Sequence, residues 1–101
     1  MKTQIRFTTE TIDLDKLEAN SIKKVEKFAN DQADNLISAD EKEDMEDNLA
    51  AIQEAAFDRV LETFPTIEVP DEAYVTEDYH PWAVQYENEN YELITAYIEI
   101  E

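Results

Sequence analysis

The chain has 101 residues, 43% of them hydrophobic, and its twenty-six acidic and eight basic residues give a formal net charge of −18. This length and apolar content suit a single acidic domain over residues 1–101, while the charge argues against direct binding to nucleic acid or to anionic membranes. The absence of cysteine excludes disulfides and thiolate metal sites, and the absence of glycine excludes the glycine-rich loops that bind phosphates.

The predicted elements begin with a half-buried strand over residues 3–11, in which Ile5, Phe7 and Thr9 alternate with polar side chains. Apolar residues then recur at steps of three or four and predict an amphipathic helix over about 14–37. Asn20-Ser21 offers a cap inside this segment, so two shorter helices are an alternative.

A second helix is predicted from the sequence Ser38-Ala39-Asp40-Glu41, which matches the S-x-x-E capping box. We expect this helix to end at Pro65 and to form an antiparallel hairpin with the first. Its apolar stripe consists of Met45, Leu49, Ile52, Ala56, Val60 and Phe64.

Residues 65–81 contain all three prolines and show little periodicity, with short edge strands expected at 66–69 and 73–76. The end of the chain predicts a β-hairpin over 82–87 and 91–100, with Asn88-Glu89-Asn90 as the turn and asparagine supplying its special conformations. The expected order is strand, helix, helix, loop, strand, strand. This order defines an α+β fold in which the helix hairpin packs on a three- or four-stranded antiparallel sheet.

The acidic residues are distributed unevenly: residues 1–12 carry a net charge of +1, residues 13–37 of −2 and residues 38–101 of −17. In one continuous second helix, six carboxylates would fall within about 40° of one line and extend over about 33 Å, close to one turn of duplex DNA. They are Asp40, Asp44, Asp47, Glu54, Asp58 and Glu62. The helix dipole favours the first of them, but repulsion between later pairs has no local compensation, so we interpret the line as a partner-binding surface. An acidic solvated face without a specific role is the alternative.

Tyrosine and tryptophan concentrate in the acidic C-terminal half, whereas all four phenylalanines precede residue 65. Trp82 is expected in the core. If the four aliphatic residues at 94, 96, 98 and 100 face the core, Tyr91 and Tyr97 lie on the opposite face. Tyrosines beside carboxylates can receive arginine side chains, which makes Glu87, Glu89, Tyr91 and Tyr97 further candidates for partner binding.

No catalytic, cofactor or metal site is predicted. Asp40, Lys42 and Asp44 lack the spacing and the glycine of a calcium-binding loop, and His80 has no recognisable catalytic neighbour. The sequence also has no apolar run near 20 residues and no signal-peptide core. We therefore expect a cytoplasmic protein that is not an enzyme.

In charge and size, the chain resembles the DNA-mimic inhibitors made by phages and mobile elements against restriction or CRISPR nucleases, and the acidic immunity proteins of nuclease toxins. The resemblance implies a small inhibitor or decoy that mimics nucleic-acid charge and blocks the basic groove of a nuclease or another DNA- or RNA-binding enzyme. The alternative is an accessory protein–protein interaction module whose charge mainly serves solubility, including a homodimer through the outer face of the sheet.

Overall fold

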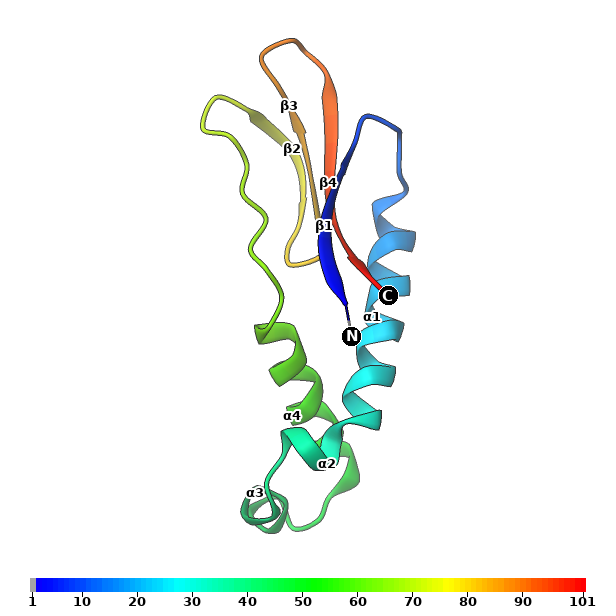
Figure 1. The fold of residues 1–101 in the computed structure, drawn as a ribbon, viewed down its shortest axis with the longest axis vertical. Helices are drawn as coiled ribbons and strands as arrows, with labels where there is room; N and C mark the ends of the chain where they lie inside the picture. The colour runs from blue at the N-terminus through cyan, green and yellow to red at the C-terminus, as the bar shows by residue number, and fades with distance from the viewer. Residues whose placement is uncertain (1) are drawn as a thin grey trace. The chain divides into compact units, whose positions relative to one another are not determined.

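The computed structural model describes residues 2–101 and shows an α+β fold with four helices and one four-stranded antiparallel sheet (Figure 1). The elements are β1 (Thr3–Thr8), α1 (Leu14–Asp31), α2 (Ala33–Leu36), α3 (Ala39–Asp44), α4 (Leu49–Glu62), β2 (Tyr74–Tyr79), β3 (Ala83–Glu87) and β4 (Leu93–Ile100). The predicted order of elements is confirmed. The chain divides into two compact units: unit 1 is Met1–Ser21 with Pro65–Glu101, and unit 2 is Ile22–Phe64.

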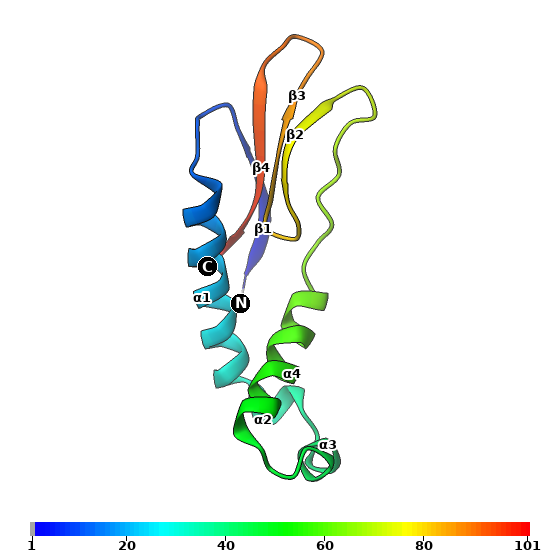
Figure 2. The ribbon, with the colours of Figure 1, turned by 180° about the vertical axis from the view of Figure 1, so that it is seen from behind.

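The sheet of unit 1 has the strand order β1-β4-β3-β2, so the first and last strands of the chain are neighbours. Side chains alternate along β4 as predicted: Ala96, Ile98 and Ile100 are buried on one face. Segment 65–73, which forms no strand, runs along the β2 side of the sheet (Figure 2). Its apolar side chains cover this face by packing against a small cluster that joins β3 and β4. The cluster is Val84, Tyr86 and Ala96, and Ile67, Val69, Ala73 and Ile94 pack against it.

The opposite face of the sheet is partly buried as well. Thr95 is fully buried there, and its hydroxyl oxygen accepts a hydrogen bond from the Gln85 amide at 3.2 Å. On the same face, Tyr79 hydrogen-bonds to Asp15 in the first turn of α1. This hydrogen bond and the negative charge of the carboxylate raise the pKa of Tyr79. The start of α1 is thereby joined to β2.

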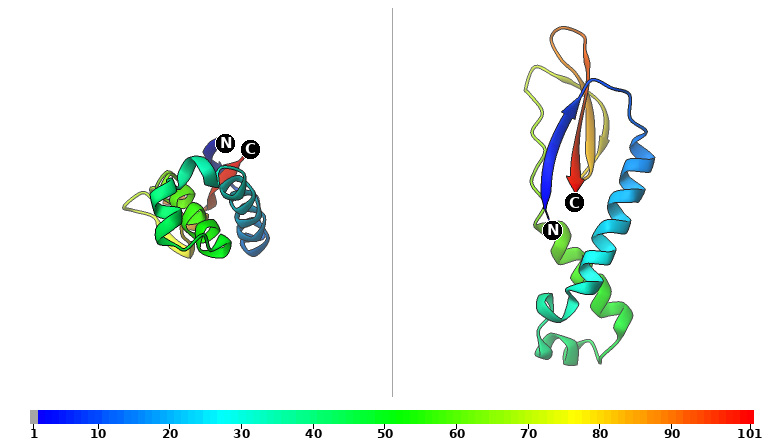
Figure 3. Two further views of the ribbon diagram at one scale, coloured as in Figure 1. Left: turned by 90° about the horizontal axis from the view of Figure 1, so that it is seen from below. Right: turned by 45° about the vertical axis from the view of Figure 1, so that its right-hand side comes forward.

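Some predicted boundaries need correction. The first strand, which lies at one edge of the sheet (Figure 3), ends at Thr8 rather than at residue 11. Phe7 on this strand, expected on its buried face, is 60% exposed. The first helix ends at Asp31, six residues early, because α2 follows as a separate short helix after Gln32. The hairpin of β3 and β4 and the burial of Trp82 are confirmed.

Unit 2 contains the later part of α1 together with α2, α3 and α4, and α1 and α4 run in opposite directions within it (Figure 1). Helices α2 and α3 bury no side chain. Leu49, expected in the apolar stripe, is 67% exposed, so the buried face of α4 begins only at Ile52. The buried side chains of the unit are Val25, Ala29, Ile37, Ile52, Ala56 and Val60.

The single helix predicted from Ser38 to Pro65 is wrong, because the chain leaves the helical path at residues 45–48. The backbone N–H groups of Glu46 and Asp47 donate to the carbonyls of Glu43 and Lys42, at 2.9 and 3.0 Å, the two bonds of a Schellman ending. Glu46 and Asp47 adopt positive φ angles of 56° and 55°. Asn48 then caps α4, its side-chain oxygen accepting from two backbone N–H groups. The predicted cap of the preceding helix by Ser38 is confirmed.

Helix α3 is held to its neighbours by two basic side chains. Arg59 of α4 donates to the Leu36 carbonyl and to the Glu41 carboxylate, and so joins α4 to α2 and α3. Lys42 pairs with Asp34, and this hydrogen bond lowers the pKa of the Asp34 carboxyl group. Because α3 buries nothing, these polar contacts and the Ser38 cap carry its attachment.

Substituting Glu46→Gly should raise the free energy of unfolding by about 0.5–1 kcal/mol, because glycine adopts the left-handed conformation at the end of α3 without steric cost. Urea denaturation measures the change. Glu46→Gln is the matched control, since it removes the same charge but keeps a Cβ atom and should give little of the gain. Equal stabilisation by the two variants would assign the effect to charge instead.

Candidate protein-binding surface

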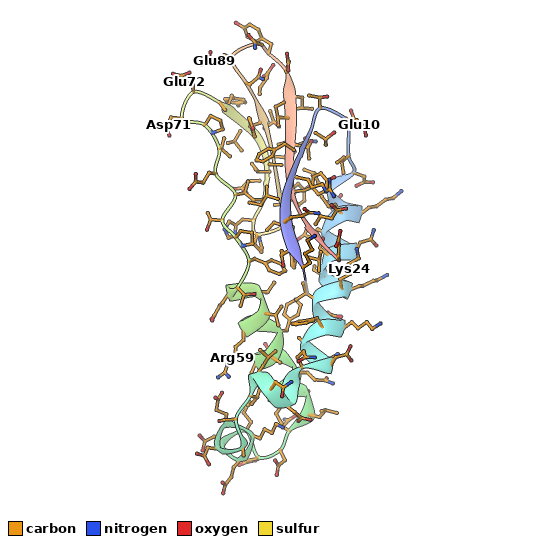
Figure 4. The ribbon with its side chains drawn as sticks, viewed as in Figure 1. Glu10, Lys24, Arg59, Asp71, Glu72 and Glu89 are labelled. Atoms are coloured by element: carbon orange, nitrogen blue, oxygen red, sulfur yellow. The ribbon has the colours of Figure 1, made fainter. Side chains whose placement is uncertain are left out.

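Three connections lie at one end of the sheet in unit 1, and each exposes carboxylates. Glu10 follows β1, Asp71 and Glu72 precede β2, and Glu89 lies between β3 and β4. Figure 4 shows these four side chains at the same end of the sheet. We call this region the acidic end, defined by residues 10, 70–74 and 87–92.

The turn between β3 and β4 is organised by Asn88. The side-chain oxygen of Asn88 accepts hydrogen bonds from the backbone N–H groups of Asn90 and Glu92, both at 3.0 Å. The backbone N–H of Asn88 donates to the Glu92 carbonyl. The expectation that asparagine would take the positive φ angle is wrong, because Tyr91 takes it, with φ of 61°. Tyr91 is also 85% exposed. An aromatic residue is thus kept in a costly conformation where it has almost no packing to gain.

The turn before β2 lies beside this hairpin turn. The Ala73 N–H donates to the Pro70 carbonyl at 3.0 Å, which closes a tight turn whose two central residues are acidic. Tyr74 follows at the start of β2, where it pairs with Glu87 across the sheet and is 72% exposed. A second exposed tyrosine therefore stands next to a carboxylate at the acidic end.

A hollow of about 270 Å³ separates the two turns. Pro70, Ala73, Asn88 and Asn90 give it an apolar and amide lining, and the carboxylates of Glu72 and Glu89 come from the two turns. Its lining residues are Pro70, Glu72, Ala73, Asn88, Glu89 and Asn90. Such a hollow suits the long aliphatic stem and cationic head of an arginine or lysine side chain.

The electrostatic potential at the acidic end is negative because few cations lie nearby in the sequence. Residues 65–101 contain ten acidic residues and no lysine or arginine. Unit 1 as a whole has fourteen acidic and three basic residues, a net charge of −11, and unit 2 has twelve and five, a net charge of −7. The mixture of signs that neutralises an ordinary protein surface is therefore absent from the C-terminal part of unit 1.

The structure brings together only part of the predicted hairpin site. Glu87, Glu89 and Tyr91 all lie at the acidic end. Tyr97 does not. It lies four residues beyond Leu93, the partner of Glu87, which is about 13 Å along β4, and there it pairs with Ala83 and Arg6. Its neighbour across the sheet is thus a basic residue rather than an acidic one.

The predicted line of six carboxylates is wrong as a continuous surface. Asp40 and Asp44 lie on α3, and Asp47 lies in the turn that ends it. Glu54, Asp58 and Glu62 remain at steps of four on α4 and are exposed on one face. All six belong to unit 2, whereas the acidic end belongs to unit 1. Unit 2 also has a hollow of about 370 Å³, lined by Glu26, Asn30, Gln53, Glu54 and Phe57.

The hollow at the acidic end could not be predicted from the sequence, because its lining comes from two separate turns. Glu72 and Tyr74 were not among the predicted binding residues, although both lie in the proline-rich connection that showed no clear periodicity. The adjacent Pro70-Asp71 is a turn signal, and Asn88 and Asn90 mark the second turn. The pairing of these two turns depends on the register of β2 with β3, which turn residues alone do not specify.

Comparison with known proteins gives no match, whether to a family model, to a curated protein or to a solved structure. Among residues 2–101, no group of three or more His, Cys, Asp and Glu side chains is placed to hold a metal ion. None of the helices in this part of the chain has the length and apolar character needed to cross a bilayer.

Proposed function

We propose that the protein is a small acidic inhibitor that binds the basic groove of a nuclease or another DNA- or RNA-binding enzyme in place of nucleic acid. It would act like anti-restriction, anti-CRISPR or nuclease immunity proteins, by binding and without catalysis. The observation that carries the proposal is the acidic end: two adjacent turns with carboxylates, a hollow between them and exposed tyrosines, in a segment without a basic residue.

The mechanism is competitive. A basic groove attracts the chain over long range because of its net charge of −18, which increases the rate of encounter. Glu72 and Glu89 then take positions that phosphates would otherwise occupy, and one arginine or lysine of the groove enters the hollow. Tyr74 and Tyr91 offer ring faces to further cations. Nucleic acid is excluded because both ligands require the same cationic side chains.

A panel of purified nucleases and DNA-binding proteins with basic grooves tests the proposal. At least one of them should bind the protein at low ionic strength. The complex should dissociate at several hundred millimolar salt, where screening is strong, and also when duplex DNA is added. An acidic globular protein of similar size and charge is the control for nonspecific attraction. Binding that resists both salt and DNA would contradict charge mimicry, and would favour the alternative of an accessory interaction module with an apolar interface.

A further inference from the structure

The sheet of unit 1 has two edge strands, β1 and β2, and they differ in how the edge is protected. The register of β2 with β3 shifts between Val75 and Glu77, and two acidic residues, Glu77 and Asp78, lie on β2. Irregular register and charge are common means of preventing a further strand from pairing. Strand β1, with the sequence TQIRFT, has an unbroken register with β4, no proline and Arg6 as its one charged residue (Figure 3). Its edge therefore has less such protection than that of β2, and the one charge, on Arg6, is paired with Glu99 of the same chain.

The ladder between β1 and β4 determines which backbone groups of β1 face outward. The Glu101 N–H donates to the Lys2 carbonyl at 3.0 Å, so the backbone of Lys2 is directed toward β4. Successive residues of a strand direct their backbone groups to opposite sides. Thr3, Ile5 and Phe7 therefore present their N–H and C=O groups away from β4. Within residues 2–101, no hydrogen bond reaches these outward groups.

We propose that this edge pairs with the same edge of a second copy, antiparallel and with Ile5 on the two-fold axis. In this register Ile5 lies opposite the partner's Ile5, and Thr3 lies opposite the partner's Phe7, with the symmetric pair on the other side of the axis. Each of the three pairs exchanges two hydrogen bonds, so every outward group of β1 is satisfied. The two four-stranded sheets become one continuous sheet.

The side chains favour the same register. Residues that pair across the axis lie on the same face of the joined sheet, so Phe7, which is 60% exposed in one chain, is covered by the partner's Thr3 and its neighbours. On the other face Arg6 lies opposite the partner's Gln4, and it is already paired with Glu99 of its own chain. A register shifted by one residue, with Arg6 on the axis, would place two arginines opposite each other and leave outward groups unpaired.

The charge distribution also selects this edge. Residues 1–12 have a net charge of +1, whereas the whole chain has −18. Two copies therefore approach with least repulsion at β1. Because the remaining charges still repel, dimerisation strengthens as salt is added. Capture by a basic groove has the opposite salt dependence, so the failure of either proposal is distinguishable from the failure of the other.

Light scattering coupled to size-exclusion chromatography, at a series of protein and salt concentrations, tests the proposal. The unmodified protein should approach twice the 11.8 kDa mass of the chain as salt is raised. Phe7→Lys should weaken dimerisation by about tenfold or more, because it adds a second positive charge to the edge strand and removes the apolar side chain that the partner's Thr3 covers. Val75→Lys is the matched control: it makes the same charge change at a 41%-exposed apolar residue of the other edge strand and should leave the dimer unchanged.

Phe7→Pro tests the backbone directly. Proline lacks the outward N–H of residue 7, so each dimer loses two hydrogen bonds while the ladder with β4 keeps all of its donors. A loss of about tenfold in dimerisation is expected, with the fluorescence of the buried Trp82 confirming that the sheet is folded. A chain that remains monomeric at every salt concentration would overturn the proposal. A dimer that survives Phe7→Lys, or one that Val75→Lys disrupts equally, would overturn it too, whether or not the proline variant folds.

Discussion

Replacing Glu72, Glu87 and Glu89 together with lysine is expected to weaken binding to a basic-groove protein by about 100-fold or more. Each reversal replaces an attraction with a repulsion at the centre of the proposed contact, and single charge pairs at interfaces contribute upward of about 1 kcal/mol. Titration calorimetry at constant ionic strength measures the loss. The thermal unfolding of the variant should stay close to that of the unmodified protein, because none of the three carboxylates forms a described ion pair.

The matched control reverses three carboxylates of unit 2, by Glu54→Lys, Asp58→Lys and Glu62→Lys. The net charge changes by the same amount, and these three side chains are exposed and form no described ion pair. This variant should lose the part of the affinity that depends on total charge, about tenfold or less, and keep the specific contact. If the two variants lose affinity equally, the acidic end has no special role. A larger loss in the control would assign the contact to α4.

Ile98→Ala should lower the free energy of unfolding by about 3 kcal/mol, within the usual range for deleting a buried aliphatic side chain. Ile98 is fully inaccessible on β4, the strand that joins β1 to β3 at the centre of the sheet. The truncation removes favourable burial and leaves a cavity that paired strands cannot close. Urea denaturation followed by the fluorescence of Trp82, which belongs to the same unit, measures the change.

Leu93→Ala, on the same strand, is the control for Ile98→Ala. Leu93 is 39% exposed at the start of β4, so its truncation should cost less than about 1 kcal/mol. Similar losses for the two variants would mean that the buried face of β4 contributes no more to stability than its end does.

Periodicity in the sequence was sufficient to predict an element where one face of that element is buried against its own unit. The alternation of Ala96, Ile98 and Ile100 predicted β4, and the turn signal at Asn88 predicted the hairpin, because both depend on short-range chemistry. The fold class followed from these elements and from the order of strand-like and helix-like patterns along the chain. The sheet order did not, since β1 pairs with β4 across almost the whole chain.

The interruption at residues 45–48 could not be predicted in the same way. An apolar stripe running from Met45 to Phe64 indicated one helix. A Schellman ending is usually recognised in a sequence by a glycine at the left-handed position. Here Glu46 takes that position, and the chain contains no glycine. Tyr91 likewise takes a positive φ angle that its residue type does not predict. Both residues look like ordinary surface positions in the sequence, yet one divides the predicted acidic line and the other projects an aromatic ring from the acidic end.

The burial of Trp82 has a practical consequence for measuring how the protein unfolds. It is the one tryptophan of the chain, it is 4% exposed, and it belongs to unit 1, whereas most helical residues belong to unit 2. Its fluorescence, excited selectively, therefore reports on the sheet, while the far-ultraviolet signal at 222 nm reports mainly on the helices. Coincident transitions by the two probes would identify one cooperative folding unit, and separate transitions would identify two. The position of a single side chain thus makes the independence of the two units an observable quantity.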